Sequence, residues 1–354
     1  MSDDGTRRAN LYEGRERPIF DPFVRNDQEP KMNPNWPFRE GLLKMYSKPK
    51  HLKQLCAMVE ENVQNVSKLG QFCASLIITY ENKHINFAST FRVGSNFWCT
   101  ARRNTLPEDL TESPVKTLHL LLSEDIPEVG DYPSFDLLAD DPLYSGKLVE
   151  CDFVVPDNRF RGVYDVDDVD LRSGLARADK SDFVFLESES DNLTGALLPY
   201  SEELKSMDQV GVLGYNLPVI ESTLERMFGD QHVRFSTISS LFNRFNKKSL
   251  SPGNILDGVS DRIFPHSCST LHGASGSAVV SLSQVGFFCG IHIGGWSKSQ
   301  VENNNYNMAC SVNHPAFVLE YVKNVLPLLD DKERSQIAPY LKKHEDLINL
   351  YKLA

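Results

Sequence analysis

The sequence predicts an all-β protein, a sandwich or barrel of short strands, with helices before and after it. Within residues 71–312, runs of β-branched, aromatic and aliphatic residues alternate with clusters of Gly, Pro, Asn and Asp. This alternation is typical of many short strands joined by turns. Residues 51–66 space their apolar side chains three and four apart, which predicts an amphipathic helix before the strands. Two further stretches with helical spacing follow them.

The predicted strands are rich in β-branched and aromatic residues and end at turn-forming residues. They span residues 72–80, 85–93, 117–122, 147–155, 182–186, 209–215, 233–239, 277–282 and 286–293. The acidic stretch 165–170 falls between them, and its adjacent carboxylates repel one another and favour solvent. We therefore interpret it as a linker between two halves, at about 71–170 and 180–312.

The segments before the strands differ from them in composition. Residues 1–48 are rich in Arg, Asn, Asp and Pro without a sustained period, which predicts a leader that is disordered or lies along the surface. Residues 49–70 contain the amphipathic helix. That helix either packs on the following strands or binds a partner, and the spacing alone leaves both interpretations open.

The region after the strands predicts two helices. Asn313 or His314 caps the first, and Pro315 takes its first helical position, where proline is favoured. The second is expected over residues 339–353, within a C-terminal helical segment at 331–354. Its apolar stripe contains Leu341, His344, Ile348 and Tyr351.

Composition excludes some classes of function. The net charge is −11, with 48 acidic against 37 basic side chains, which argues against a nucleic-acid-binding protein. No apolar run approaches the ~20 residues that span a bilayer, and the polar residues 1–17 contain no signal peptide. The seven cysteines are odd in number and lie beside apolar residues without a C-x-x-C pair. They predict free thiols in a reducing intracellular compartment, the cytoplasm. We expect no cofactor and no metal, and the sequence indicates no oligomeric state.

The segment 268–280 is Cys-Ser-Thr-Leu-His-Gly-Ala-Ser-Gly-Ser-Ala-Val-Val. A nucleophilic serine needs a turn that presents its hydroxyl while backbone amides face the developing oxyanion. Gly273 and Gly276 flank Ser275 and tolerate the backbone angles of such a turn. Small-residue turns before strands are also common without catalysis, so the segment alone leaves a purely structural turn open.

A second segment follows closely, Val-Gly-Phe-Phe-Cys-Gly-Ile-His-Ile-Gly-Gly-Trp at residues 285–296. Together the two segments resemble trypsin-like serine peptidases, and within them the glutamyl endopeptidases and picornaviral main proteases. The resemblance implies two chymotrypsin-like antiparallel β-barrels within residues 71–330. It also implies that Ser275 is the nucleophile, and that the backbone N–H groups of Gly273 and Ser275 form the oxyanion site.

The same resemblance implies a pocket for the side chain that precedes the scissile bond. Those families line it with a G-I-H-x-G-G strand, which matches residues 290–295. Thr270, His292 and Gly294 are then the substrate-binding residues. A hydroxyl and an imidazole suit an acidic or glutamine side chain by hydrogen bonding. Without the resemblance, His292 is an internal strand histidine with a satisfied hydrogen bond.

The catalytic acid and base are matched less completely. Asp182, at the start of a predicted strand, resembles the triad aspartate, although a lone aspartate there is otherwise a turn residue. Residues 100–103, Thr-Ala-Arg-Arg, resemble the T-A-x-H segment, with Arg103 in the place of the histidine. A guanidinium stays protonated and cannot take the serine proton. We expect Arg103 and Asp182 to form an ion pair instead.

These observations leave three hypotheses. The first is a pseudopeptidase that lacks the general base and retains a cleft for a peptide or protein with an acidic or glutamine side chain. The second is an active serine endopeptidase that cleaves after Glu or Gln, with a base that is not placed; His84, His119 and His272 are the histidines nearest the motifs. The third is an unrelated β-rich binding module.

Overall fold

A computed structural model gives the fold and describes most of the chain from Lys68 to Leu353. The described residues are 68–105, 114–127, 132–164, 181–189, 194–216, 248–268, 270, 273–297 and 305–353. Several sequence-based predictions lie outside them: the leader 1–48, the helix at 51–66, the acidic stretch 165–170, the strand at 233–239, and His272.

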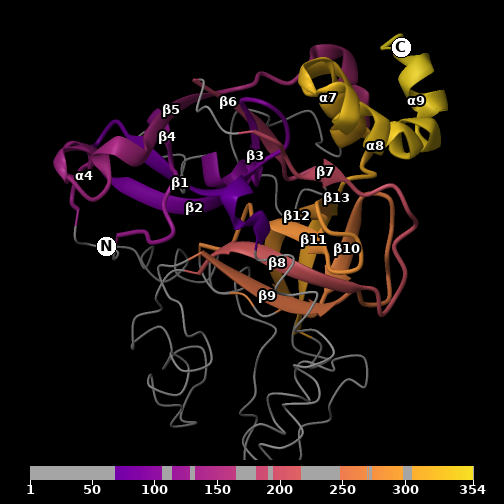
Figure 1. Cartoon of the computed structure of the whole chain (residues 1–354), viewed down its shortest axis with the longest axis horizontal. Helices are drawn as coiled ribbons and strands as arrows, with labels where there is room; N and C mark the ends of the chain where they lie inside the picture. The colour runs from indigo at the N-terminus through magenta and orange to yellow at the C-terminus, as the bar shows by residue number, and fades with distance from the viewer. Residues whose placement is uncertain are drawn as a thin grey trace, which may run out of the picture.

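The first half of the chain forms a closed antiparallel barrel of six strands (Figure 1). The strands are β1 (Cys73–Tyr80), β2 (Ile85–Arg92), β3 (Phe97–Thr100), β4 (Val115–Leu121), β5 (Leu148–Phe153) and β6 (Val184–Ser188). Their order around the barrel is β1-β2-β3-β6-β5-β4. Alternate side chains of these strands fill the interior, where Leu76, Trp98 and Leu120 are completely buried.

The second half forms a sheet of the order β10-β13-β12-β11-β8-β9. Its strands are β8 (Gln209–Tyr215), β9 (Lys248–Asn254), β10 (Ile263–His266), β11 (Ala278–Ser281), β12 (Phe287–Ser297) and β13 (Asn305–Ser311), and the short β7 (Leu198–Pro199) pairs in parallel with β12. The edge strands β9 and β10 meet at a bridge between Ile255 and His266. The Leu256 N–H donates to the Pro265 carbonyl at 2.9 Å beside it. These contacts close the sheet over a short stretch.

The two barrels share one topology. Counted from its own first strand, each follows the order first, second, third, sixth, fifth, fourth around the ring. This repeated order and the antiparallel pairing confirm the predicted double β-barrel. The boundary between the two barrels was expected near residues 170–180. However, β6 pairs with β3 and β5 of the first barrel. The first barrel therefore extends to Ser188, because the charged run that suggested a linker connects two strands of the same barrel.

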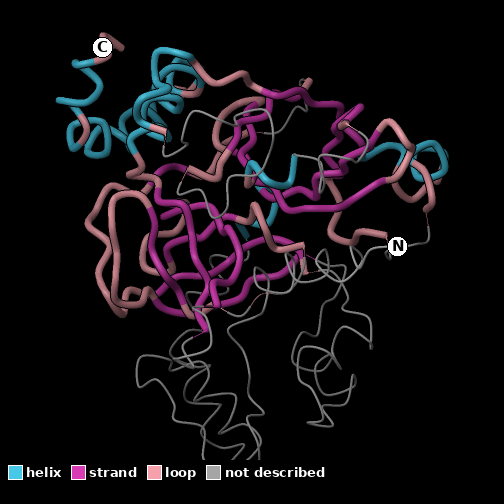
Figure 2. Tube along the Cα trace, turned by 180° about the vertical axis from the view of Figure 1, so that it is seen from behind, coloured by secondary structure: helices cyan, strands magenta, loops and turns pink. Residues whose placement is uncertain are grey.

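The described α-helices lie at two ends of the molecule, and Figure 2 shows shorter helical turns between them, all in cyan. The α-helices are α4 (Phe135–Asp140), α7 (Pro315–Asn324), α8 (Asp331–Lys343) and α9 (Glu345–Leu350). The short 3-10 helices are η1 (Lys68–Phe72), η2 (Arg102–Thr105), η3 (Ser145–Lys147), η4 (Asn158–Val163) and η5 (Leu326–Leu328). Phe317 of α7 lies over Phe288 with 5.9 Å between ring centroids, and Phe288 lies 4.9 Å from Phe91. One apolar core therefore joins α7 to both barrels.

Of the two helix starts predicted near the C-terminus, the structure confirms the first and corrects the second. His314 caps α7, since its Nδ1 accepts from the Ala316 N–H at 3.1 Å, and Pro315 takes the first position as predicted. The second helix begins at Asp331 rather than at Pro339. Asp330 and Glu333 form a reciprocal capping box there, which fixes the start of α8 and leaves Pro339 inside the helix.

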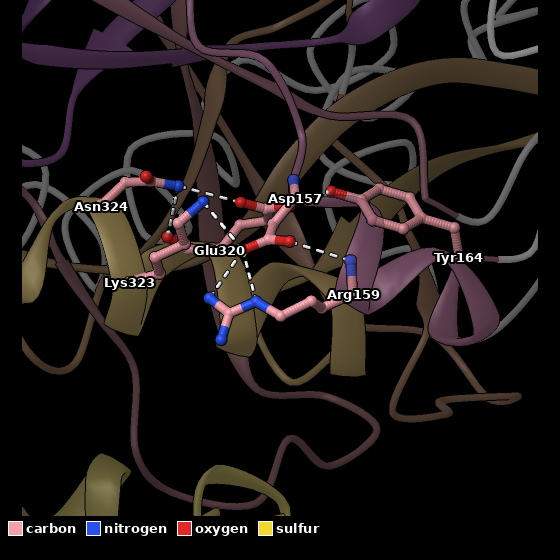
Figure 3. Close-up of polar contacts among 6 residues, drawn as sticks. All are labelled: Asp157, Arg159, Tyr164, Glu320, Lys323 and Asn324. Carbon is pink, nitrogen blue, oxygen red and sulfur yellow. Dashed lines mark hydrogen bonds and ion pairs between the residues drawn. The ribbon is translucent and has the colours of Figure 1, made fainter. Parts of the chain in front are cut away.

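A buried carboxylate fastens α7 to the segment that contains η4 (Figure 3). Glu320 is 2% exposed and accepts from the Asp157 N–H at 2.7 Å, the Tyr164 hydroxyl at 3.0 Å and the Asn324 amide at 2.9 Å. Burial raises the pKa of Glu320 above its ordinary value. The Asp157 carboxylate contacts Lys323 at 2.9 Å. Two acidic groups thus hold one turn of α7 against the connection between β5 and β6.

Candidate active site

Ser89 of β2 joins the two barrels at the predicted nucleophile turn. Its N–H donates to the Ser275 carbonyl at 3.2 Å, and its hydroxyl donates to the Gly273 carbonyl at 2.8 Å. The Tyr215 N–H of β8 donates to the same hydroxyl at 3.0 Å. A side chain of the first barrel therefore fixes the position of a turn in the second.

The turn around Ser275 needs glycine on both sides. Gly273 and Gly276 have φ of +85° and +87°, in the region that favours glycine. A Cβ at Gly276 would lie 2.2 Å from the Ser89 carbonyl oxygen, so the backbones approach too closely for a side chain. The Gly276 N–H donates to the His292 carbonyl at 2.8 Å, which holds the turn against β12. Ser275 itself is 5% exposed.

The pairing of β3 with β6 places Arg103 beside Asp182. Thr100 at the end of β3 faces Val184 at the start of β6, so the residues just beyond these ends are neighbours. The Arg103 N–H donates to Asp182 Oδ1 at 3.0 Å, and the Arg103 Nε lies 2.8 Å from Oδ2. The Nε–H is not aimed at that oxygen, so this second contact is an ion pair rather than a hydrogen bond. Both carboxylate oxygens of Asp182 thus contact Arg103.

Asn104 connects this ion pair to the serine turn. Its side-chain amide donates to the Ser275 carbonyl at 2.8 Å and to the Thr100 hydroxyl at 3.0 Å. Arg103 and Ser275 therefore belong to two segments that contact each other directly. The sequence motifs did not single out Asn104, because an asparagine after the T-A-x-H position carries no catalytic chemistry of its own.

His292 lies in β12 with its side chain buried against a second histidine. Its Nδ1 is 3.2 Å from the Nε2 of His266 in β10, and the two are 1% and 0% exposed. Burial lowers the pKa of His266 to about 3. Burial also lowers the pKa of His292 well below its ordinary value, and the neighbouring His266 and Arg103 lower it further. Both imidazoles are therefore neutral at physiological pH, and one donates a hydrogen bond to the other.

Thr270 is linked to these histidines through β13. The Asn307 amide donates to the Thr270 hydroxyl at 2.9 Å and to the Cys268 carbonyl at 2.6 Å. Asn307 pairs with His266 across the β10–β13 ladder. The Asn307 Oδ1 and His266 Nδ1 are buried without a hydrogen-bond partner in the described part of the chain. Neither His266 nor Asn307 was predicted, because both belong to strands without a strong β pattern.

Gly294 supplies the bend at the end of this group. It has φ of +100°, and the register between β12 and β13 shifts between His292 and Gly294. The hydrogen bonds described above place Thr270 and His292, which were predicted to line one pocket, in one buried polar cluster with His266 and Asn307.

The other described histidines have contacts elsewhere. His84 stacks on Tyr80 with 6.2 Å between ring centroids, and His119 stacks on Phe135 with 4.0 Å. The His344 Nε2 lies 3.1 Å from Asn313 Oδ1. None of these contacts involves Ser275. His272, the remaining histidine near the motif, lies outside the described residues.

The described residues contain no group of three or more His, Cys, Asp or Glu side chains that could hold a metal ion. Of the helices in the described ranges, none is long and apolar enough to cross a membrane. Within the described ranges, six cysteines are buried: Cys73, Cys99, Cys151, Cys268, Cys289 and Cys310. Burial raises the pKa of the Cys73 thiol to about 12, which makes it a poor nucleophile.

No protein-family model and no curated protein matches the sequence. Among solved structures, the chain is similar to the active form of the Rv3671c protease from M. tuberculosis, with a TM-score of 0.40 and 11% identity over 72% of this chain and 82% of that one. It is also similar to the serine endoprotease from Yersinia pestis, with a TM-score of 0.39 and 12% identity over 71% of this chain and 62% of that one. The fold follows from the order of strands in the two barrels.

Proposed function

We propose that the protein is a pseudopeptidase, a double-barrel serine peptidase homologue that binds a peptide without cleaving it. The observation that carries this proposal is the contact of Arg103 with both carboxylate oxygens of Asp182. In a catalytic triad, that carboxylate orients a histidine that accepts the serine proton and later returns it to the leaving amine. A guanidinium does neither, because it stays protonated at every accessible pH.

The kinetic consequence is large. Loss of one triad member typically reduces turnover by about 10⁴-fold or more, and leaves only what binding and the oxyanion donors supply. The turn around Ser275 nevertheless has Gly273 and Gly276 at positive φ, which supports its comparison with a nucleophile turn. A retained turn beside an absent base supports binding as the remaining activity of the site.

The bound side chain is acidic or a glutamine. Thr270 and His292 are buried, at 3% and 1% exposure, and each already has one hydrogen-bond partner. The Thr270 hydroxyl proton and the second ring nitrogen of His292 would bind the carboxylate or amide oxygen of a ligand. His266 contacts His292, and Asn307 donates to Thr270. A site built on hydrogen-bonding groups rejects apolar side chains, because these would leave the groups unpaired. The partner is then a peptide or a protein segment. The burial of the cysteines in the described ranges is compatible with a reducing compartment.

An active endopeptidase that cleaves after Glu or Gln is the second candidate. The intact Ser275 turn and the retained Asp182 favour it. It requires a general base other than the residue at position 103.

A fluorophosphonate probe separates the two candidates, because it reacts with a serine only when a base activates the hydroxyl. We expect the full-length protein to remain unlabelled under conditions in which an added active serine protease is labelled. Labelling of the wild type that disappears in Ser275→Ala would overturn the pseudopeptidase proposal. Ser275→Ala should bind a glutamine-containing peptide as well as the wild type does, because no bond to the hydroxyl is made.

A further inference from the structure

Among the described residues, the guanidinium of Arg103 is engaged at Nε only. Its backbone N–H and its Nε contact Asp182, at 3.0 and 2.8 Å. The two Nη atoms contact no group among the described residues, and the side chain is 22% exposed. A guanidinium can donate from two edges at once. The ion pair with Asp182 engages Nε, so within the described part of the chain the two Nη donors are left for a ligand.

The segment that contains Arg103 lies against the turn of the predicted nucleophile. The Arg103 segment touches the Ser275 turn through Asn104, 2.8 Å from the Ser275 carbonyl. The same turn contacts β12, because the Gly276 N–H donates to the His292 carbonyl at 2.8 Å. In a peptidase of this fold, the carbonyl group of the residue in the pocket lies beside the serine, within reach of the base. Arg103 occupies the position of that base.

A permanent cation there favours a ligand that ends in a carboxylate. When a chain terminates at the residue that fills the pocket, the carbonyl group is replaced by an α-carboxylate. The planar guanidinium binds a carboxylate through two parallel hydrogen bonds, which are stronger than neutral ones. An active peptidase must release such a carboxylate after each cleavage, whereas a protein without turnover has no such requirement.

We infer that the site recognises the free C-terminal carboxylate of a peptide whose last side chain fills the pocket, with the Nη atoms of Arg103 as its ionic partner. The inference rests on the proposed function, since it assumes that the Thr270–His292 pocket binds a Gln or Glu side chain. Beyond the proposed function, the inference specifies the class of ligand, which is a chain terminus rather than an internal segment. His266 and His292 are neutral, whereas the guanidinium of Arg103 carries a permanent positive charge.

Isothermal titration calorimetry with matched peptides tests the inference on the full-length wild-type protein. The probes are acetyl-Ala-Ala-Ala-Gln with a free C-terminal carboxylate and the same peptide as its C-terminal amide, and the corresponding pair ending in Glu. The free acids should bind on the order of tenfold to a hundredfold more tightly than the amides, as a charge-assisted hydrogen bond contributes. The preference should weaken as salt is added.

Variants then assign the preference to Arg103. Arg103→Gln should bring the acid-to-amide ratio close to one. Because that change leaves Asp182 buried without its partner, Arg103→Gln combined with Asp182→Asn repeats the test without an unpaired carboxylate. Lys332→Gln, which removes a charge from the exposed face of α8, should keep the preference.

Each outcome has a separate meaning. Equal affinity for acid and amide overturns the inference and leaves the proposed function in place. Binding of neither peptide by a chain with a folded circular dichroism spectrum overturns the proposed function itself. A preference that persists in both Arg103 variants overturns the role of Arg103.

Discussion

Replacement of Gly276 by alanine should strongly destabilise the junction between the barrels. A Cβ at this position would lie 2.2 Å from the Ser89 carbonyl oxygen, 2.2 Å from the Thr100 hydroxyl and 2.8 Å from the Asn104 amide nitrogen. One of these atoms belongs to the backbone and cannot rotate away. The φ of +87° is also unfavourable for any residue with an L side chain.

The magnitude follows from these contributions. Forcing a side chain into the left-handed region costs about 1–2 kcal/mol, and overpacking a filled site costs a further ~1–3 kcal/mol. The Thr100 hydroxyl donates to the Ser89 carbonyl at 2.7 Å, and displacing that bond costs about 1 kcal/mol more. The free energy of unfolding should therefore fall by about 4 kcal/mol in Gly276→Ala.

Gly286→Ala is the matched control. Gly286 has φ of +97°, yet a Cβ there would meet no atom within 4 Å. It should lose only the conformational part, about 1–2 kcal/mol. Urea unfolding of the two variants and the wild type, followed by circular dichroism, measures both losses. Equal losses in the two variants would refute the close approach of Gly276 to the first barrel.

Three further predictions concern the site and its surroundings. Arg103→His should restore fluorophosphonate labelling of Ser275 and slow hydrolysis of Glu- or Gln-containing peptides; no gain in a folded variant would mean that the missing imidazole is not what prevents catalysis. The raised pKa of Glu320 means that the native state binds its proton more tightly than the unfolded state, so stability falls as pH rises above the ordinary value of 4.5 through the raised value. Melting temperatures across this range should show the wild type losing stability relative to Glu320→Gln as pH rises, and parallel curves would contradict the burial of this carboxylate. Burial raises the pKa of Cys151 to about 12, so iodoacetamide at pH 8 should leave it and the other buried thiols unmodified until urea unfolds the chain, as mass spectrometry would report.

Strands with a strong β pattern could be predicted from the sequence, and those with turn-forming residues could not. The predicted range 209–215 coincides with β8 (Gln209–Tyr215). By contrast, β9 contains Pro252 and Gly253, residues that favour turns, and it is a strand because it pairs with β8 along its length. Gly253 is also needed there, since a Cβ would lie 2.6 Å from the Cys268 backbone nitrogen. Such close approaches depend on residues that are distant in the sequence.

The candidate site shows the same division. The motifs predicted the Arg103–Asp182 ion pair because two short segments resembled the ends of neighbouring strands, and the pairing of β3 with β6 brings those ends together. The contact of His292 with His266 could not be predicted, since it joins side chains of β12 and β10 across the strand between them. The catalytic and substrate-binding roles of Ser275, Thr270 and Gly294 remain predictions that the labelling and binding experiments address.

The hydrogen bonds of Ser89 also make the site a reporter of motion between the barrels. The amide hydrogens of Ser89 and Tyr215 are both held by bonds that cross from one barrel to the other. They exchange with solvent deuterium only when the barrels separate locally, whereas amides inside either ring stay protected. Matching exchange rates at these two amides would give the free energy of that opening directly. The same opening would draw the Ser275 turn away from Arg103, so that free energy would also give the fraction of molecules in which the candidate site is disassembled.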